Sequence, residues 1–418
     1  MTIHAPSGRV FISLKAGEIV TAPSIASTTA VPVFNVTGVA TYGDLGLTSV
    51  FATDGFLYYT YSTSATPSTC ADTGSGAVTR PAASVLGCPT AGALARVALF
   101  SNGSIRVDTT EIILGGVVAK GGVCSQFTSL GIDGVTLGPD GALYVGVGTG
   151  ANDLADGGTD IGQYGADPCG VVGAAFGGHF RAQTSSSFDG KILRVDVTTK
   201  VATVFSSGFH NPWRHVWASV PSSRTSAPPS QPALYTLDPG GANATTDEIN
   251  GPLLLGANAG WPCLVGSSTK TIFSDLGAPA CASSSMDAFL QPMYSTSHPG
   301  SPGTYSALAY FPPLNRWVYA DYTQGGIYSF DAFEGSKTSA SSSSLSKDGK
   351  FTFGVDLFYD ASSEKLFVVD VVKGTVTVVA VGSGPKVNPS ATSSALARTS
   401  IFTEGLALLV VIVIVAVF

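Results

Sequence analysis

One stretch of the chain, Gly208–Pro262, concentrates the side chains that could carry out chemistry. It opens with GFHNPWR, in which His210, Asn211 and Arg214 flank an Asn-Pro turn. A histidine in a cleft titrates near neutral pH, so His210 could act as a general base beside an amide and a guanidinium. The same residues could equally line an ordinary polar turn, and their types alone do not decide between the two interpretations.

A glycine-rich loop with acidic residues follows in the same stretch. In LDPGGANATTDEIN, Gly240 and Gly241 precede the adjacent carboxylates of Asp247 and Glu248. Backbone carbonyls and carboxylates are the hard oxygen ligands that Ca²⁺ prefers, so this loop is a candidate calcium site. The alternative is a polar loop that carries a glycan, because Asn243 begins an Asn-X-Thr sequon inside it.

The composition indicates that short strands must position these side chains. Of the 418 residues, 44% are hydrophobic and 12% are charged, while glycine (50) and proline (24) are frequent. Such a chain can bury a large core and turn often. No long segment has the 3.6-residue period of an amphipathic helix. Segments rich in β-branched and aromatic residues recur between turns, for example at Phe56–Tyr61, Ala142–Val147, Lys191–Val197 and Lys365–Val371.

One paired-hairpin unit recurs along the chain. It appears as GRVFISLKAGEIV, as DGALYVGVG followed by DGKILRVDV, as RWVYADYTQGGIYSFD and as EKLFVVDVVKGTVTVV. Asp-Gly pairs, which favour hairpin turns, accompany several of these strands. The repeat predicts an all-β fold, a β-propeller with six blades of roughly 60 residues each. A pair of β-sandwiches or a β-helix is the alternative.

Three further segments, taken in order with the motifs above, resemble the glucose/sorbosone dehydrogenase family. They are DLGLTSVFATDGFLYYTYS (Asp44–Ser62), GVTLGPDGALYVGVGTG (Gly134–Gly150) and FDGKILRVDV (Phe188–Val197). Members of that family are β-propellers, and several use pyrroloquinoline quinone (PQQ) to oxidise sugars. The ordered series is far more specific than any one segment, and the resemblance covers most of the chain.

The resemblance also implies a set of catalytic positions. In the family a His takes the proton from the sugar hydroxyl, an Asp orients that His, and Arg and Lys neutralise the carboxylates of PQQ. An alignment without gaps places Leu130 at the His position, Thr149 at the Asp position, and His210 and Gly326 at two Arg positions. The lead interpretation is a propeller with a degraded catalytic site that binds a carbohydrate or a protein. The alternatives are an active, divergent quinoprotein that uses His210 with PQQ and Ca²⁺, and a purely adhesive or structural propeller.

The resemblance assigns roles to the remaining candidates. Asn211 and Trp261 would contact PQQ, with Trp261 as a stacking face, although Trp261 could equally be a packed aromatic in a turn. His179 and His215 are expected to be structural. The segment that corresponds to the calcium loop of the family contains Gly240, Gly241, Asp247 and Glu248.

Charge and cysteine content indicate the setting in which the protein works. The net charge is −7 and the pI about 5.1, so a nucleic-acid partner is not expected. The six cysteines form no C-x-x-C motif, which disfavours zinc, and their even number favours disulfides between neighbours in sequence, although 15 pairings are possible. Together with three Asn-X-Ser/Thr sequons, they predict a secreted glycoprotein. The expected pairs are Cys70–Cys88, Cys124–Cys169 and Cys263–Cys281, and the expected glycan acceptors are Asn35, Asn102 and Asn243.

The C-terminal end predicts attachment to a membrane. Leu406–Phe418 is an uninterrupted apolar sequence, preceded by a polar spacer and a run of small residues. This is the layout of a GPI-anchor signal, with Ser393, Ser394 and Ala395 as candidate attachment residues. A short membrane-spanning anchor or a buried final strand is the alternative.

These features divide the chain into three parts. We expect a propeller at residues 1–382, a stalk at 383–404 and a hydrophobic tail at 405–418. A GPI anchor requires a secretory signal, which Met1–Val10 does not resemble. A longer natural N-terminus, and a location on the extracellular face of the plasma membrane, are therefore expected.

Overall fold

The computed structural model describes most of the propeller and a short part of the tail. The described residues are 1–27, 29–41, 43–63, 89–119, 122–125, 130–151, 169, 177–222, 228–240, 246–266, 269–270, 281, 288–297, 305–322, 326–332, 343–344, 354–361, 363–370, 375–379 and 412–413.

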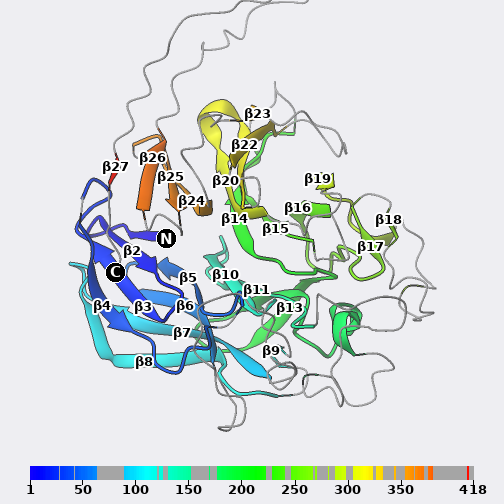
Figure 1. The fold of residues 1–418 in the computed structure, drawn as a ribbon, viewed down its shortest axis with the longest axis horizontal. Coiled ribbons are helices and arrows are strands. Elements are labelled where there is room, and N and C mark those ends of the chain that lie inside the picture. Colours follow the sequence, from blue (N-terminus) through cyan, green and yellow to red (C-terminus); the bar gives the residue numbers. More distant parts are fainter. Residues whose placement is uncertain are drawn as a thin grey trace, which may run out of the picture.

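Six antiparallel sheets follow one another along the chain and surround a common centre, as the blades of a propeller (Figure 1). Each blade has four strands in sequence order, so the prediction of an all-β propeller with six blades is confirmed. Blade 1 consists of β1 (Thr2–His4), β2 (Arg9–Ser13), β3 (Glu18–Ala22) and β4 (Val31–Asn35). Blade 2 consists of β5 (Leu47–Ala52), β6 (Phe56–Thr63), β7 (Thr90–Leu99) and β8 (Ile105–Gly115), with β9 (Cys124–Ser125) beside β7.

The other four blades are built in the same way. Blade 3 consists of β10 (Ile132–Leu137), β11 (Leu143–Val147), β12 (Lys191–Val195) and β13 (Ala202–Ser207). Blade 4 consists of β14 (Arg214–Ala218), β15 (Ala233–Asp238), β16 (Thr246–Leu253) and β19 (Tyr294–Ser297), next to a small ribbon of β17 (Leu264–Val265) and β18 (Thr269–Lys270). Blade 5 consists of β20 (Tyr305–Phe311), β21 (Arg316–Asp321), β22 (Gly326–Asp331) and β23 (Ser343–Ser344). Blade 6 consists of β24 (Gly354–Asp360), β25 (Lys365–Asp370), β26 (Thr375–Val379) and β27 (Ile412–Val413).

The blades are held together by apolar side chains between them. Trp317 of blade 5 is fully buried and packs with Tyr235 of blade 4, their ring centroids 4.6 Å apart. The ring closes where Val10 of the first blade packs with Phe367 of the last. These two blades, blue and orange, lie side by side in Figure 1. Where neighbouring blades cover both faces of a strand, as at β11 and β12, nearly every residue of the strand is buried.

The inner strands share a local irregularity that connects the blades. In β5, β10, β20 and β24 the register shifts by a bulge near the start of the strand. A bulge re-aims a side chain and frees backbone groups, and here these groups bond across the blades. Thr48 Oγ1 donates to Ile132 O at 2.8 Å, and Trp213 Nε1 donates to Ser306 O at 3.0 Å. Ser306 Oγ in turn contacts Gly354 O, so a belt of polar contacts runs through blades 2 to 6.

Two of the three expected disulfides lie within the described residues and both are confirmed. Cys124 pairs with Cys169, and Cys263 pairs with Cys281. The expected Cys70–Cys88 pair, the candidate glycan acceptor Asn243 and the candidate anchor residues Ser393–Ala395 lie outside the described residues.

Part of the predicted hydrophobic tail forms a strand. Ile412 and Val413 make up β27, the outer strand of blade 6, where they pair with Thr377 and Val376. Within the described residues, no helix has the length and apolar character that crossing a membrane would require.

Candidate functional site

Two of the three candidate catalytic residues, His210 and Asn211, lie at the mouth of the propeller where the inner strands begin. His210 and Asn211 lie in the turn just before β14, and their backbone N–H groups donate to Asp238 at 3.1 and 2.5 Å. Asp238 ends β15, the neighbouring strand of the same blade. The Asn-Pro turn of the sequence is therefore fixed by one buried carboxylate, which sets the position of the His210 ring.

Three aromatic rings pack together at this mouth, the two histidines stacked and Trp261 edge-on to both. The His210 ring centroid lies 4.6 Å from that of Trp261 and 5.8 Å from that of His179, while His179 and Trp261 are 5.3 Å apart. All three side chains are buried, with at most 3% of their surface exposed. Trp261 is thus packed against two rings of its own chain, those of His179 and His210.

The hydrogen bonds of the two histidines fix part of their protonation. His210 Nδ1 lies 2.8 Å from the carbonyl oxygen of Pro239. A carbonyl can only accept, so the proton of the neutral ring is on Nδ1 and the lone pair is on Nε2. His179 Nδ1 lies 3.2 Å from Thr149 Oγ1, a group that can donate or accept. His210 therefore has the tautomer that a base would need.

Two buried cations lie below His179. Arg181 donates from Nη2 to Thr149 O at 2.6 Å and pairs through Nε with Asp189 at 2.8 Å. Lys191 Nζ donates to the carbonyl oxygens of Arg181, Ala182 and Asp189 at 2.7 to 2.9 Å. Both cations are 1% exposed, and burial lowers the pKa of Lys191 to about 7. Their contacts tie the short 3₁₀ helix η2 (Gly178–Gln183) to blade 3.

Blade 4 buries three carboxylates, those of Asp238, Asp247 and Glu248. Asp247 accepts from the N–H of Gly240 at 2.9 Å and from that of Tyr305 at 3.0 Å, which ties blade 4 to blade 5. Glu248 accepts from Asn250 Nδ2 at 3.0 Å and from the N–H of Gly266. These bonds use carboxylate oxygens that a metal ion would share, so the acids act first as anchors for the backbone.

Burial also changes the charge of these acids. It raises the pKa of Glu248 to about 8, with a further contribution from the nearby Asp238. It raises the pKa of Asp238 to about 6, against the partly opposing effect of His210. A carboxylic acid that stays protonated at neutral pH is a weak cation ligand. A bound cation would itself favour the ionised form.

The structure brings together some of the predicted residues and separates others. Leu130 and Thr149, at the family's His and Asp positions, lie beside His210, since Gly150 N–H donates to Leu130 O and Thr149 N–H donates to His210 O at 3.0 Å. Arg214 starts β14 and reaches across the channel, where its Nη2 lies 3.4 Å from Val355 O in blade 6. Gly326 begins β22 in blade 5, and Gly241 lies outside the described residues.

Two histidines that were expected to be structural, His179 and His215, lie against residues of the site or of a cavity in the fold. His179 was expected to be structural, yet its ring contacts both His210 and Trp261. Its segment, GHFRAQ, has neither strand periodicity nor a family motif, and its contact with Trp261 spans 82 residues of sequence. His215 lies between blades 3 and 4, bonded through Nδ1 to Thr236 Oγ1 at 2.9 Å, and burial lowers its pKa to about 3.

The residues present can be tested against PQQ and Ca²⁺, the groups that the resemblance implies. The carboxylates of PQQ need cations, and the described cations nearest the three rings, Arg181 and Lys191, are already bound to backbone oxygens and to Asp189. Among the described residues, no cluster of three His, Cys, Asp or Glu side chains is arranged to hold a metal. In their present arrangement Arg181 and Lys191 therefore do not form the clamp that the carboxylates of PQQ would need.

Comparison with solved structures confirms the fold that the resemblance implied. The PQQ-bound aldose sugar dehydrogenase of Streptomyces coelicolor is 17% identical, with a TM-score of 0.56 over 87% of this chain and 85% of that one. A putative oxidoreductase (glucose dehydrogenase) of Thermus thermophilus is 17% identical, with a TM-score of 0.54 over 93% of each chain. The calcium structure of a Trichoderma reesei enzyme of carbohydrate-active family AA12 is 11% identical, with a TM-score of 0.53 over 89% of this chain and 95% of that one. No protein-family model and no curated protein sequence matches the chain.

Proposed function

We propose that this chain is a binding propeller on the scaffold of the PQQ-dependent sugar dehydrogenases, and that it recognises a carbohydrate rather than oxidising one. One observation carries the proposal: the ring cluster of His179, His210 and Trp261 is closed by its own packing. Beside it, Arg181 pairs with Asp189, and Lys191 donates to backbone carbonyl oxygens. A quinone needs a stacking face and a cationic clamp, so it would have to disrupt both the ring cluster and the contacts of Arg181 and Lys191.

The setting of the protein is part of the proposal. We infer a secreted glycoprotein held at the cell surface by its C-terminal segment. Asn35, at the end of β4, and Asn102, in the turn between β7 and β8, are both exposed, so an oligosaccharide could be attached without disturbing the blades. The two disulfides support an oxidising compartment, since such bonds are rare in the cytosol.

An active, divergent quinoprotein is the second candidate, and the tautomer of His210 favours it. The unprotonated Nε2 that follows from the Nδ1 contact with Pro239 would suit a general base. PQQ would supply the hydride acceptor if it were bound. His210 would hold and pass the proton, and Asp238 would keep the turn that carries His210 in place.

The deciding experiment is titration of the purified chain with PQQ and Ca²⁺, followed by a panel of aldoses with a dye acceptor. The aldose sugar dehydrogenase of Streptomyces coelicolor serves as the positive control. We expect no saturable change in quinone absorbance and no sugar-dependent dye reduction. Tight binding with sugar-dependent reduction that is lost in His210→Asn would reject the binding-propeller proposal in favour of the quinoprotein.

A further inference from the structure

The propeller has a second mouth, and it holds a cavity of about 720 Å³. The cavity is lined by all of β14 and by the later residues of β5, β10, β20 and β24, whereas His210 lies four residues before β14. The two sites therefore lie toward opposite ends of the channel. A volume of this size is within the range of pockets that enclose small-molecule ligands.

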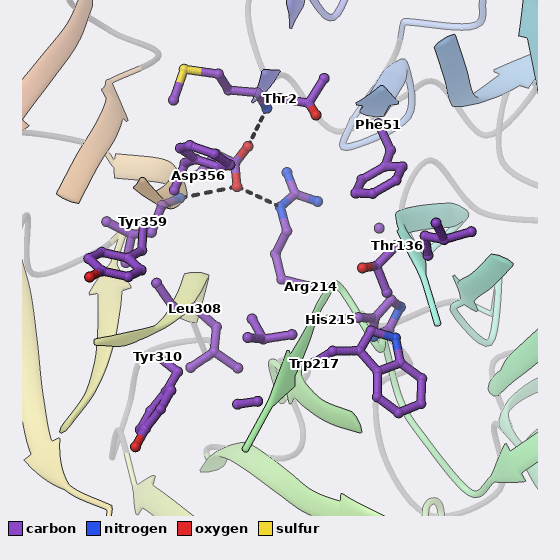
Figure 2. Close-up of a pocket in the computed structure, with 18 of the residues that line it drawn as sticks. Thr2, Phe51, Thr136, Arg214, His215, Trp217, Leu308, Tyr310, Asp356 and Tyr359 are labelled. Carbon is purple, nitrogen blue, oxygen red and sulfur yellow. Dashed lines mark hydrogen bonds and ion pairs between the residues drawn. The ribbon is translucent and has the colours of Figure 1, made fainter. Parts of the chain in front are cut away.

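Aromatic side chains form the walls of this cavity (Figure 2). Phe51 comes from blade 2, Trp217 from blade 4, Tyr310 from blade 5 and Tyr359 from blade 6, and all four are half-buried. A flat aromatic face presents apolar surface in a defined orientation, and it packs well on the C–H face of a sugar ring. The four side chains come from four blades and lie around the space.

Polar groups of both signs meet on the floor of the cavity. Figure 2 shows the Arg214 side chain at its centre, with Nε 3.6 Å from Asp356 Oδ1. Arg214 is 13% exposed and Asp356 is 21% exposed, so both are held in place yet reachable. Asp356 Oδ2 also accepts from the amino group of Met1 at 2.5 Å. Paired donors and acceptors suit hydroxyl groups, which do both, better than an ion of one sign.

Contacts within the fold hold the Arg214 side chain in place. Arg214 Nη1 donates to Trp213 O at 3.0 Å, and its guanidinium carbon lies 4.7 Å from the centroid of the Trp213 ring. Fixed planar groups lose little entropy when a ligand binds, so they give specificity at low cost.

Two side chains that line the cavity, His215 and Trp217, each have a buried nitrogen without a hydrogen-bond partner among the described residues. In the part of the chain that the structure describes, Trp217 Nε1 is buried and makes no hydrogen bond. A buried donor without an acceptor costs free energy. A hydroxyl of a bound ligand could recover this free energy if the Trp217 ring, which Tyr144 contacts edge-on, turned slightly toward it.

We propose that the cavity at the second mouth binds a neutral saccharide, with Trp217, Tyr310 and Tyr359 stacking on its rings and the Arg214–Asp356 pair bonding adjacent hydroxyls. The inference deepens the proposed function by naming a site and a ligand class. It does not depend on whether the His210 mouth oxidises a sugar. An acidic sugar would be held by Arg214 alone and would meet Asp356 with a like charge.

The test is binding of neutral and acidic glycans to the full chain, first on a glycan array and then by calorimetry with the best neutral oligosaccharide. Tryptophan fluorescence gives a local signal because Trp217 lines the cavity. Tyr359→Ala and Arg214→Lys should each weaken binding by about tenfold, consistent with one lost stacking or bidentate contact. Tyr322→Ala, at an exposed tyrosine of blade 5 that does not line the cavity, is the matched control and should bind as the wild type does.

Circular dichroism and urea unfolding separate loss of binding from loss of folding in these variants. Absence of any neutral glycan that binds at millimolar concentration would overturn the inference. So would a preference for acidic glycans, or binding that both variants leave unchanged. A saccharide that binds here and is also oxidised with PQQ would support this site while rejecting the proposed function, so the two failures are distinguishable.

Discussion

Replacing Glu248 by glutamine should remove a large part of the pH dependence of stability. Burial raises the pKa of Glu248 from 4.5 to about 8, so between these values the folded chain holds a proton that the unfolded chain has released. Stability therefore falls as pH rises through this window, by about 1.4 kcal/mol for each pH unit. The full effect of this one group is about 5 kcal/mol, and it is reached above pH 8, once the folded chain has also released the proton.

Glutamine keeps the contacts of the protonated acid without its titration. Its carbonyl oxygen can accept from the N–H of Gly266, as Glu248 does. Its amide can donate to Asn250 Oδ1, a buried atom that has no partner among the described residues, once the Asn250 amide turns over. We therefore expect Glu248→Gln to fold normally and to be less sensitive to alkaline pH.

The measurement is urea unfolding of both proteins between pH 6 and 8. Asp238, with a raised pKa of about 6, contributes mainly below this range. The stability of the variant relative to the wild type should rise by about 2 kcal/mol across the two pH units, because Glu248 is already half ionised at pH 8. Other titrating groups, including Lys191, are common to both proteins and cancel in the difference. The exposed substitution Glu364→Gln is the control and should leave the curve of the wild type unchanged.

Parallel pH curves for the wild type and Glu248→Gln would refute the reasoning, because they would mean that Glu248 ionises as readily in the fold as in water. Repeating the wild-type series with Ca²⁺ tests the predicted calcium loop. A bound cation favours ionised carboxylates, so it would reduce the slope. An unchanged slope at saturating Ca²⁺ would count against Asp247 and Glu248 as ligands.

The two disulfides and the two exposed sequons give the remaining predictions. Removing Cys263–Cys281, which closes 18 residues, should lower the free energy of unfolding by about 3 kcal/mol, and removing Cys124–Cys169, which closes 45, by about 4 kcal/mol. Urea unfolding of the paired Cys→Ser variants measures both, and no loss in either would show that the crosslink does not restrict the unfolded chain. In a secretory host, Asn35→Gln and Asn102→Gln should each remove one glycan, seen as one mass step sensitive to endoglycosidase. Identical masses for wild type and variants would contradict the extracellular setting.

The fold could be predicted because its information is local. A strand such as β12 carries β-branched and apolar residues between two turns, and Asp189-Gly190 marks its start. Gly190 has a φ of +67°, a conformation that favours glycine, so the turn residue is required by the backbone. The repeat of such hairpins then limits the architecture to one that stacks many small sheets.

The sites could be predicted only where a motif fixes them. His210 and Asn211 were found because the Asn-Pro turn is itself a local structure, and Asp238 reaches them across a single pair of strands. His179 could not be placed, since its contact with Trp261 depends on the packing of two irregular segments. Arg214 follows the turn by three residues, and the motif suggested that it belongs to the His210 group.

The direction of Arg214 shows why sequence adjacency misleads in a propeller. An inner strand runs the length of the channel, so residues a few positions apart on it can serve different mouths. His210 precedes β14 and lies among rings at one mouth, while Arg214 and Trp217 on β14 line the cavity at the other. In this fold, a motif that spans the start of an inner strand thus contributes residues to two sites. The chemistry at one mouth of the channel can therefore change while the other mouth keeps a binding surface.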